Sequence, residues 1–186
     1  MLLLGAETIQ SFDEDSVEAN TMGNLYEHVY HAALTEKNWG FATKDVALNR
    51  LADAPTDLGW LHQFQLPSDC LAIINVLNSS WGRSEYIKQG NLLLSNEPTL
   101  NLKYIYTVDE SQLPAWFVDY LVHKLAVTAL IKVTGVNEDR DRLSADLKRA
   151  KSNALKRDEE QNPQRDVMAQ ARANLIAIRN GGSSSF

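Results

Sequence analysis

The first third of the chain has the hydrophobic spacing of a helix. After an acidic run and a serine suited to helix capping, Ser16, small and apolar residues recur every three or four positions at Leu25, Val29, Ala32 and Ala33. This pattern predicts a helix over about 16–37.

The middle of the chain changes to the alternation that is typical of strands. Apolar and polar residues alternate over 60–66 and again over 100–106, whereas 70–77 is apolar on nearly both faces, as in a central strand. Gly90-Asn91 suits a hairpin turn between 85–89 and 91–94. We therefore expect four or five antiparallel strands in a β-rich insert over about 40–110.

Helical spacing returns after Pro114, a residue that suits a first helical position. A helix over 114–134 is mostly apolar, which indicates burial on most sides, yet its charges at Asp119, Lys124 and Lys132 exclude a membrane span. A charged helix follows over 138–160. Its apolar residues form one narrow seam at spacings of four, three and four: Leu143, Leu147, Ala150 and Ala154.

The last residues predict an arm. Asn162-Pro163 breaks the charged helix, and a short amphipathic helix with Val167, Ala171, Leu175 and Ile178 on one side precedes a Gly/Ser tail that ends at Phe186. The expected fold class is therefore α+β: a helical bundle with an inserted antiparallel β-rich subdomain, residues 1–162, and a C-terminal helical arm, residues 163–186.

Charge and cysteine content narrow the possible functions. The 186 residues carry a net charge of −6, which argues against wrapping nucleic acid as a primary activity. The single cysteine, Cys70, excludes an internal disulfide and a cysteine-built zinc site, and is consistent with folding in a reducing cytoplasm.

The sequence carries no strong catalytic motif. It has no glycine-rich phosphate loop, and its two neighbouring histidines, His28 and His31, lack an evident third metal ligand. Cys70 falls where a strand becomes apolar, which favours a buried, inert thiol. We expect no catalytic, cofactor or metal site. A virion-associated glycan hydrolase that uses two carboxylates remains an alternative, as does an oligomeric scaffold unrelated to phage tails.

The tryptophans divide into two groups. Trp39, Trp60 and Trp116 lie in apolar segments and are expected in the core. Trp81 lies with Arg83 in a polar loop, where an exposed tryptophan is typical of an interface anchor.

Several short motifs, in order, resemble the tail tubular protein A family, the head-to-tail adaptors of short-tailed, T7-like bacteriophages. They are Leu4-Gly5-Ala6-Glu7, Trp39-x-Phe41-Ala42, Leu66-Pro67-x-Asp69-Cys70-Leu71, Tyr104-Ile105 and Pro114-x-x-Phe117. The chain departs from the family at Ala72, where these proteins often have arginine.

The resemblance implies a structural role at the head–tail junction of a virion assembled in the host cytoplasm. Members of the family form a homododecameric ring between the portal protein and the tail nozzle, tail tubular protein B, and genomic DNA passes through the ring. For this chain we expect subunit contacts along 138–160 through the seam Leu143, Leu147, Ala150 and Ala154. We expect the arm to dock on the portal through Val167, Ala171, Leu175, Ile178 and Phe186, and Trp81 and Arg83 to contact the nozzle or tail fibres.

Overall fold

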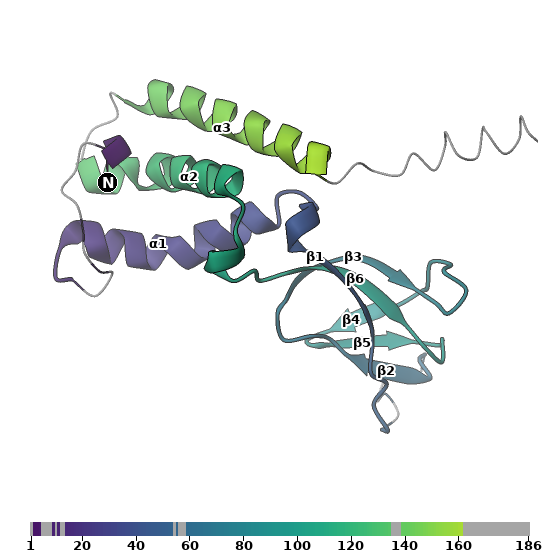
Figure 1. The fold of residues 1–186 in the computed structure, drawn as a ribbon. Helices are drawn as coiled ribbons and strands as arrows, with labels where there is room; N and C mark the ends of the chain where they lie inside the picture. Colours follow the sequence, from purple (N-terminus) through teal and green to yellow (C-terminus); the bar gives the residue numbers. More distant parts are fainter. Residues whose placement is uncertain are drawn as a thin grey trace, which may run out of the picture.

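The computed structural model describes residues 2–4, 9, 11, 14–53, 55, 59–134 and 139–161. In this part of the chain, three α-helices and two three-stranded antiparallel sheets form the expected α+β fold (Figure 1). The predicted arm, 163–186, lies outside the described residues, as does Gly5-Ala6-Glu7 of the first motif.

The helices lie side by side, with α2 (Ala115–Thr134) between α1 (Val17–Leu34) and α3 (Arg140–Gln161) (Figure 1). Ser16 caps α1 as predicted, since its Oγ accepts the Ala19 N–H at 3.1 Å. Pro114 lies one residue before α2, and its carbonyl accepts the Phe117 N–H at 2.9 Å. The three predicted helices before the arm are thus confirmed, with their ends shifted by up to a turn.

Most described side chains of α2 are buried or half-buried, as predicted, but one stripe of the helix is exposed. Its partner helices occupy two sides, and the side that faces neither leaves Val118 and Val122 40% and 45% exposed. Farther along, the short 3-10 helix η1 (Leu2–Leu4) packs on α2, where Leu4 joins Ala126 and Leu130 in a buried cluster.

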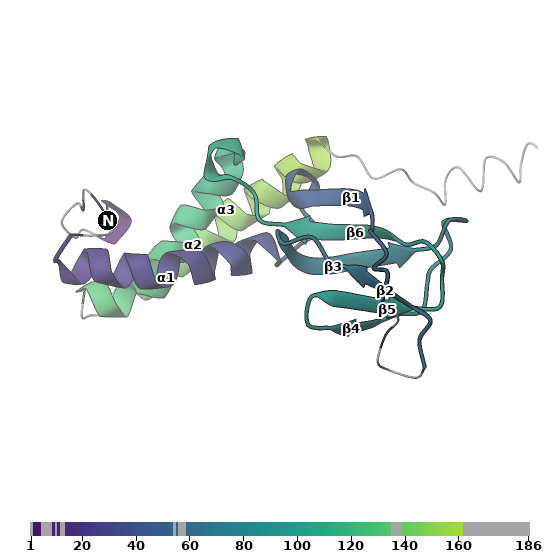
Figure 2. The ribbon, with the colours of Figure 1, turned by 90° about the horizontal axis from the view of Figure 1, so that it is seen from below.

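The β unit is inserted between α1 and α2 and consists of two sheets at one end of the helices (Figure 2). One sheet has the order β1-β6-β3 and the other β2-β5-β4. The strand bounds are β1 Thr43–Ala47, β2 His62–Gln65, β3 Cys70–Leu77, β4 Ile87–Gln89, β5 Leu92–Ser95 and β6 Asn101–Tyr106.

Strand β3 has the predicted bounds but not the predicted central place, which β6 takes. β3 is an edge strand whose two faces are nevertheless both covered. Leu71 and Ile74 pack on the helical core, whereas Val76 belongs to the core between the sheets. This double cover explains why its sequence resembles that of a central strand.

The hairpin β4–β5 turns at Gly90-Asn91 as predicted, and Gly90 has φ +56°, which glycine adopts without steric cost. β1 was not predicted, and it raises the number of described strands to six, one more than expected.

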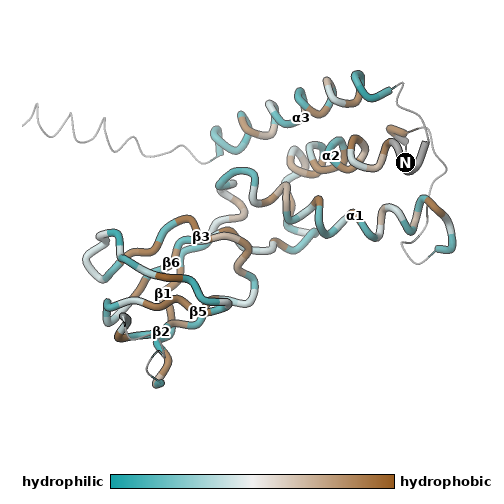
Figure 3. Tube along the Cα trace, turned by 180° about the vertical axis from the view of Figure 1, so that it is seen from behind, coloured by the Kyte–Doolittle hydropathy of each residue, from teal (hydrophilic) through white to brown (hydrophobic). Residues whose placement is uncertain are grey.

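Two short 3-10 turns connect the helices with the β unit. η2 (Gly40–Ala42) leads from the helices into β1, and η3 (Glu110–Gln112) leads from β6 back toward α2. Figure 3 shows that α3 is hydrophilic along most of its length, with hydrophobic positions only at intervals.

Candidate functional site

The joint between the helices and the β unit is an aromatic cluster built from the motif residues. Trp39 is fully buried, as predicted, and its Nε1–H donates to the Ala33 carbonyl at 3.0 Å. The ring of Phe117 meets Trp39 edge-on at 5.5 Å and Phe41 at 4.9 Å between centroids. Trp116 lies beside them, half-buried and packed against this core, whereas Trp60 is half-buried elsewhere and is not part of it.

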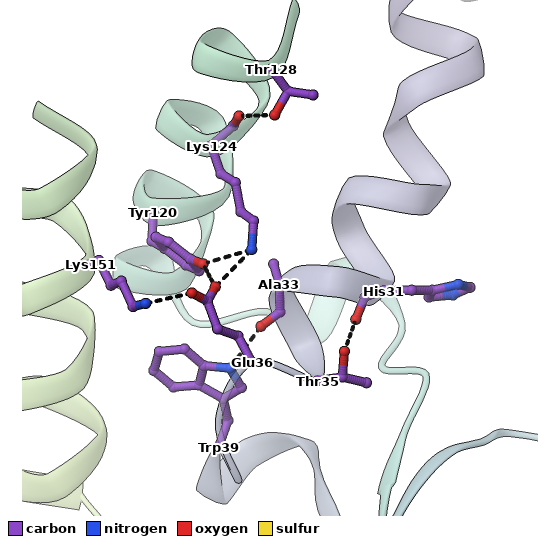
Figure 4. Close-up of polar contacts among 9 residues, drawn as sticks. All are labelled: His31, Ala33, Thr35, Glu36, Trp39, Tyr120, Lys124, Thr128 and Lys151. Atoms are coloured by element: carbon purple, nitrogen blue, oxygen red, sulfur yellow. Dashed lines mark hydrogen bonds and ion pairs between the residues drawn. The ribbon is translucent and has the colours of Figure 1, made fainter. Parts of the chain in front are cut away.

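A charged cluster lies on top of this joint and connects all three helical segments (Figure 4). Glu36, just after α1, accepts hydrogen bonds from Lys124 of α2 at 2.7 Å, from Lys151 of α3 and from the Tyr120 hydroxyl. Burial alone would raise the pKa of Glu36, but the hydrogen bonds from Lys124, Lys151 and Tyr120 lower it to about 2. Burial and the hydrogen bond to Glu36 raise the pKa of Tyr120.

A second carboxylate ties the end of α3 to the same joint. Asp158 is 3% exposed; it accepts the Gly40 N–H at 2.9 Å and forms an ion pair with Lys37 at 3.3 Å. Since Gly40 starts η2, Asp158 stabilises the N-terminus of the turn that enters the β unit. These contacts hold groups in place and put no nucleophile next to a base.

The Leu-Pro-x-Asp-Cys-Leu motif fixes the start of β3. Asp69 accepts the Tyr104 hydroxyl at 3.1 Å and pairs with Lys44 at 3.2 Å, and the Lys44 ammonium lies 3.6 Å from the centroid of the Tyr106 ring. One carboxylate therefore connects all three strands of the sheet.

Cys70 is half-buried rather than buried as expected, and burial raises the pKa of its thiol. A raised pKa keeps the thiol protonated near neutral pH, which disfavours nucleophilic chemistry at this position.

The seam of α3 is used within the chain. Leu143, Ala150 and Ala154 are at most 4% exposed; Leu147 packs on the cluster that contains Ala150 and Ala154, and Leu143 packs in the cluster that contains Ala126 and Leu130. Their expected role as the subunit interface is therefore corrected: a narrow apolar seam needs a neighbouring helix, and α2 of the same chain is that neighbour. The polar face of α3 remains exposed.

Trp81 is the most exposed of the large hydrophobic residues described, at 73%, as its loop position predicted. It has φ +62°, a conformation rare for a residue with a large side chain. The turn is held by Asn78, whose Oδ1 accepts the Ser80 and Gly82 N–H groups at 3.0 and 2.9 Å. Arg83 is also exposed and bridges back to Leu77 through its backbone.

The expected portal-docking residues, Val167, Ala171, Leu175, Ile178 and Phe186, lie outside the described residues, so their role stays a prediction. In the described part of the chain, no group of three histidine, cysteine or carboxylate side chains has the geometry of a metal site. None of the described helices is long and apolar enough to cross a bilayer.

A polar groove of about 350 Å3 runs between α2 and α3. Its charges are balanced, so it favours neither an anionic nor a cationic small ligand; the lining residues are Trp116, Asp119, Asn153, Lys156, Arg157 and Glu160. The charged cluster around Glu36 was missed in the sequence, because its members are scattered from 36 to 151 and no local spacing marks them.

Comparison with known proteins adds no identification. No protein-family model matches the chain, and no curated protein matches it.

Proposed function

We propose that this chain is a structural virion protein, a ring-forming head-to-tail adaptor that joins the portal to the tail nozzle and forms part of the DNA channel. One observation carries the proposal. Four of the five motifs that resemble the tail tubular protein A family contribute residues to one hydrophobic cluster at the joint, among them Trp39, Ile105 and Phe117, with Leu71 packed against it.

The architecture supports the same proposal. A helical unit with a β unit inserted between α1 and α2 is the arrangement that the resemblance implies, and it follows the expected order along the chain. The cluster at Glu36 and the pair at Asp158 tie α3 to the joint, so the helical unit can transmit force as one body.

The adaptor would act by adhesion, without a covalent step or a cofactor. The β unit presents Trp81 and Arg83 to the nozzle or tail fibres, and the arm 163–186 docks on the portal. Subunits meet through surfaces other than the buried seam of α3, and the ring holds the head–tail junction of the virion.

The test is assembly with the portal protein of the same phage. The chain is purified, mixed with assembled portal and examined by native mass spectrometry and negative-stain electron microscopy. We expect closed rings of this chain on one end of the portal. A chain that stays monomeric and unbound in the presence of portal overturns the proposal.

The arm is tested separately with a chain that ends at Asn162. The shortened chain keeps every described element, through the end of α3 at Gln161. We expect the far-UV circular dichroism spectrum to keep the helical signal of α1, α2 and α3. We expect portal binding to be lost. Undiminished portal binding by the shortened chain would remove the arm from the docking surface.

A further inference from the structure

The two sheets have four end strands; β2 and β3 form isolated bridges to Arg50 and Arg83, whereas β1 and β4 have no such bridge among the described residues. Each is the end strand of its sheet, and every residue of β4 and all but one of β1 are exposed. Strand edges with free backbone groups readily accept another strand. We propose that β1 of one copy of this chain pairs antiparallel with β4 of the next copy, which makes the sheets continuous around the ring.

The backbone of β1 shows which groups are available. The Leu48 N–H donates to the Leu100 carbonyl of the segment leading into β6 at 2.8 Å, and Val46 lies opposite Leu102 in the same register. Because hydrogen-bonding direction alternates along a strand, the N–H and C=O groups of Asp45 and Ala47 point away from β6. In the described part of the chain these groups have no partner.

In β4, too, alternate backbone groups point away from the sheet. The two-residue turn Gly90-Asn91 makes Gln89 and Leu92 the closing hydrogen-bonded pair of the hairpin. Ile87 therefore also bonds toward β5, whereas the backbone groups of Lys88 and Tyr86 point outward. Neither group bonds elsewhere among the described residues.

One antiparallel register matches both edges. It places Asp45 opposite Lys88 and Ala47 opposite Tyr86, so that outward backbone groups meet outward backbone groups. Between these pairs it places Val46 opposite Ile87. The Asp45 carboxylate then faces the Lys88 ammonium. The register that pairs the backbone groups therefore also pairs opposite charges.

The register also covers exposed apolar surface. Val46, Tyr86 and Ile87 are 37%, 38% and 42% exposed in the single chain, and all three fall within the paired segment. The Tyr86 ring would stand beside Ala47, whose small side chain opens onto a groove of about 210 Å3 that Leu77 and Trp81 also line. In one copy Asp45 makes only a loose contact with Lys103, at 3.9 Å, so it remains available to Lys88.

The position of the two edges suits a head-to-tail assembly. The chain passes from β1 directly to the β2 side, where Leu51 N–H bonds to the Gln63 carbonyl, and from β3 to β4 along Ser84, whose N–H bonds to the Val76 carbonyl. The β1 and β4 edges therefore lie on opposite sides of the β unit (Figure 2). Two different surfaces on opposite sides repeat the same contact from copy to copy, the kind of interface that forms a ring when the rotation between copies closes.

The test is a pair of cysteines, Val46→Cys with Ile87→Cys, in a Cys70→Ser background of the full chain. An opposed pair without mutual hydrogen bonds has Cα atoms roughly 4.5 Å apart, within disulfide range. After copper–phenanthroline oxidation, with and without portal, we expect a ladder of covalent oligomers in denaturing electrophoresis. The matched control, Val46→Cys with Lys88→Cys, points its second thiol to the opposite face and should give no ladder.

A second pair of variants tests the charges. Asp45→Lys and Lys88→Asp should each reduce the fraction of chain in rings, and the two together should restore it. This inference rests on the proposed adaptor function, but the two fail differently. Rings on the portal without a ladder from the Val46–Ile87 pair overturn the strand pairing and leave the adaptor function standing, whereas a monomer that neither binds portal nor forms a ladder overturns both.

Discussion

Glu36 shows how one side chain can hold three helices. Its lowered pKa means that the folded chain favours the carboxylate, so this contribution to stability is complete above the ordinary pKa of about 4.5. It is lost as the pH falls from there toward 2. We expect Glu36→Gln to lower the free energy of unfolding at pH 7 by about 1–2 kcal/mol, because the group is about one-third exposed and partly screened.

Urea unfolding measured from pH 7 to pH 2.5 checks this prediction. Relative to the wild type, Glu36→Gln should show a smaller loss of stability below pH 4.5. Glu159→Gln is the matched control, since Glu159 is 72% exposed and makes only a 3.4 Å contact with Lys37. Equal effects of the two variants would contradict a special role for Glu36.

Trp81 has a backbone conformation that costs stability. Glycine adopts φ near +60° without the clash of a Cβ, so Trp81→Gly should raise the free energy of unfolding by roughly 0.5–1 kcal/mol. Chemical denaturation measures this directly, with Trp81→Ala as the control that removes the ring but keeps the strain. If Trp81 anchors the nozzle, both variants weaken nozzle binding, and the glycine variant does so while being more stable. A Trp81→Gly variant less stable than the wild type would contradict backbone strain at Trp81.

At the level of elements, α3 depends on α2 of its own chain. Leu143 is 1% exposed, so Leu143→Ala should lower the free energy of unfolding of the monomer by about 2–4 kcal/mol. Thermal unfolding of a dilute, monomeric sample measures this change. Leu61→Ala is the same substitution at a residue 66% exposed and should change stability by less than about 0.5 kcal/mol. If the Leu143→Ala monomer were as stable as the wild type but assembled poorly, the seam would be a subunit interface after all.

The elements also show where sequence reasoning worked and where it stopped. Periodicity placed β3 and the hairpin at Gly90-Asn91 correctly, because side-chain spacing and turn residues are local signals. Periodicity could not show that β3 is an edge strand covered on both faces rather than a central strand. Nor could it show that the apolar seam of α3 packs within the chain rather than between subunits. Both distinctions depend on which surfaces meet in three dimensions. β1 was not predicted because its mostly exposed residues, Thr43–Ala47, show almost no alternation of apolar and polar side chains.

At the level of the whole molecule, net charge bears on the proposed passage of DNA through the ring. The net charge is −6, the first lysine or arginine is Lys37, and several of the cations of α3 are paired with neighbouring carboxylates, as in Arg149 with Asp146. Neutralising phosphates requires a basic face, and a passage for DNA functions better when DNA does not bind to its wall. We expect no shift of duplex DNA in a gel at about 100 mM salt, for the free chain and for portal-bound rings alike. A shift that weakens as salt rises would reveal a basic surface created by assembly, and would make the channel wall attractive rather than indifferent to the genome.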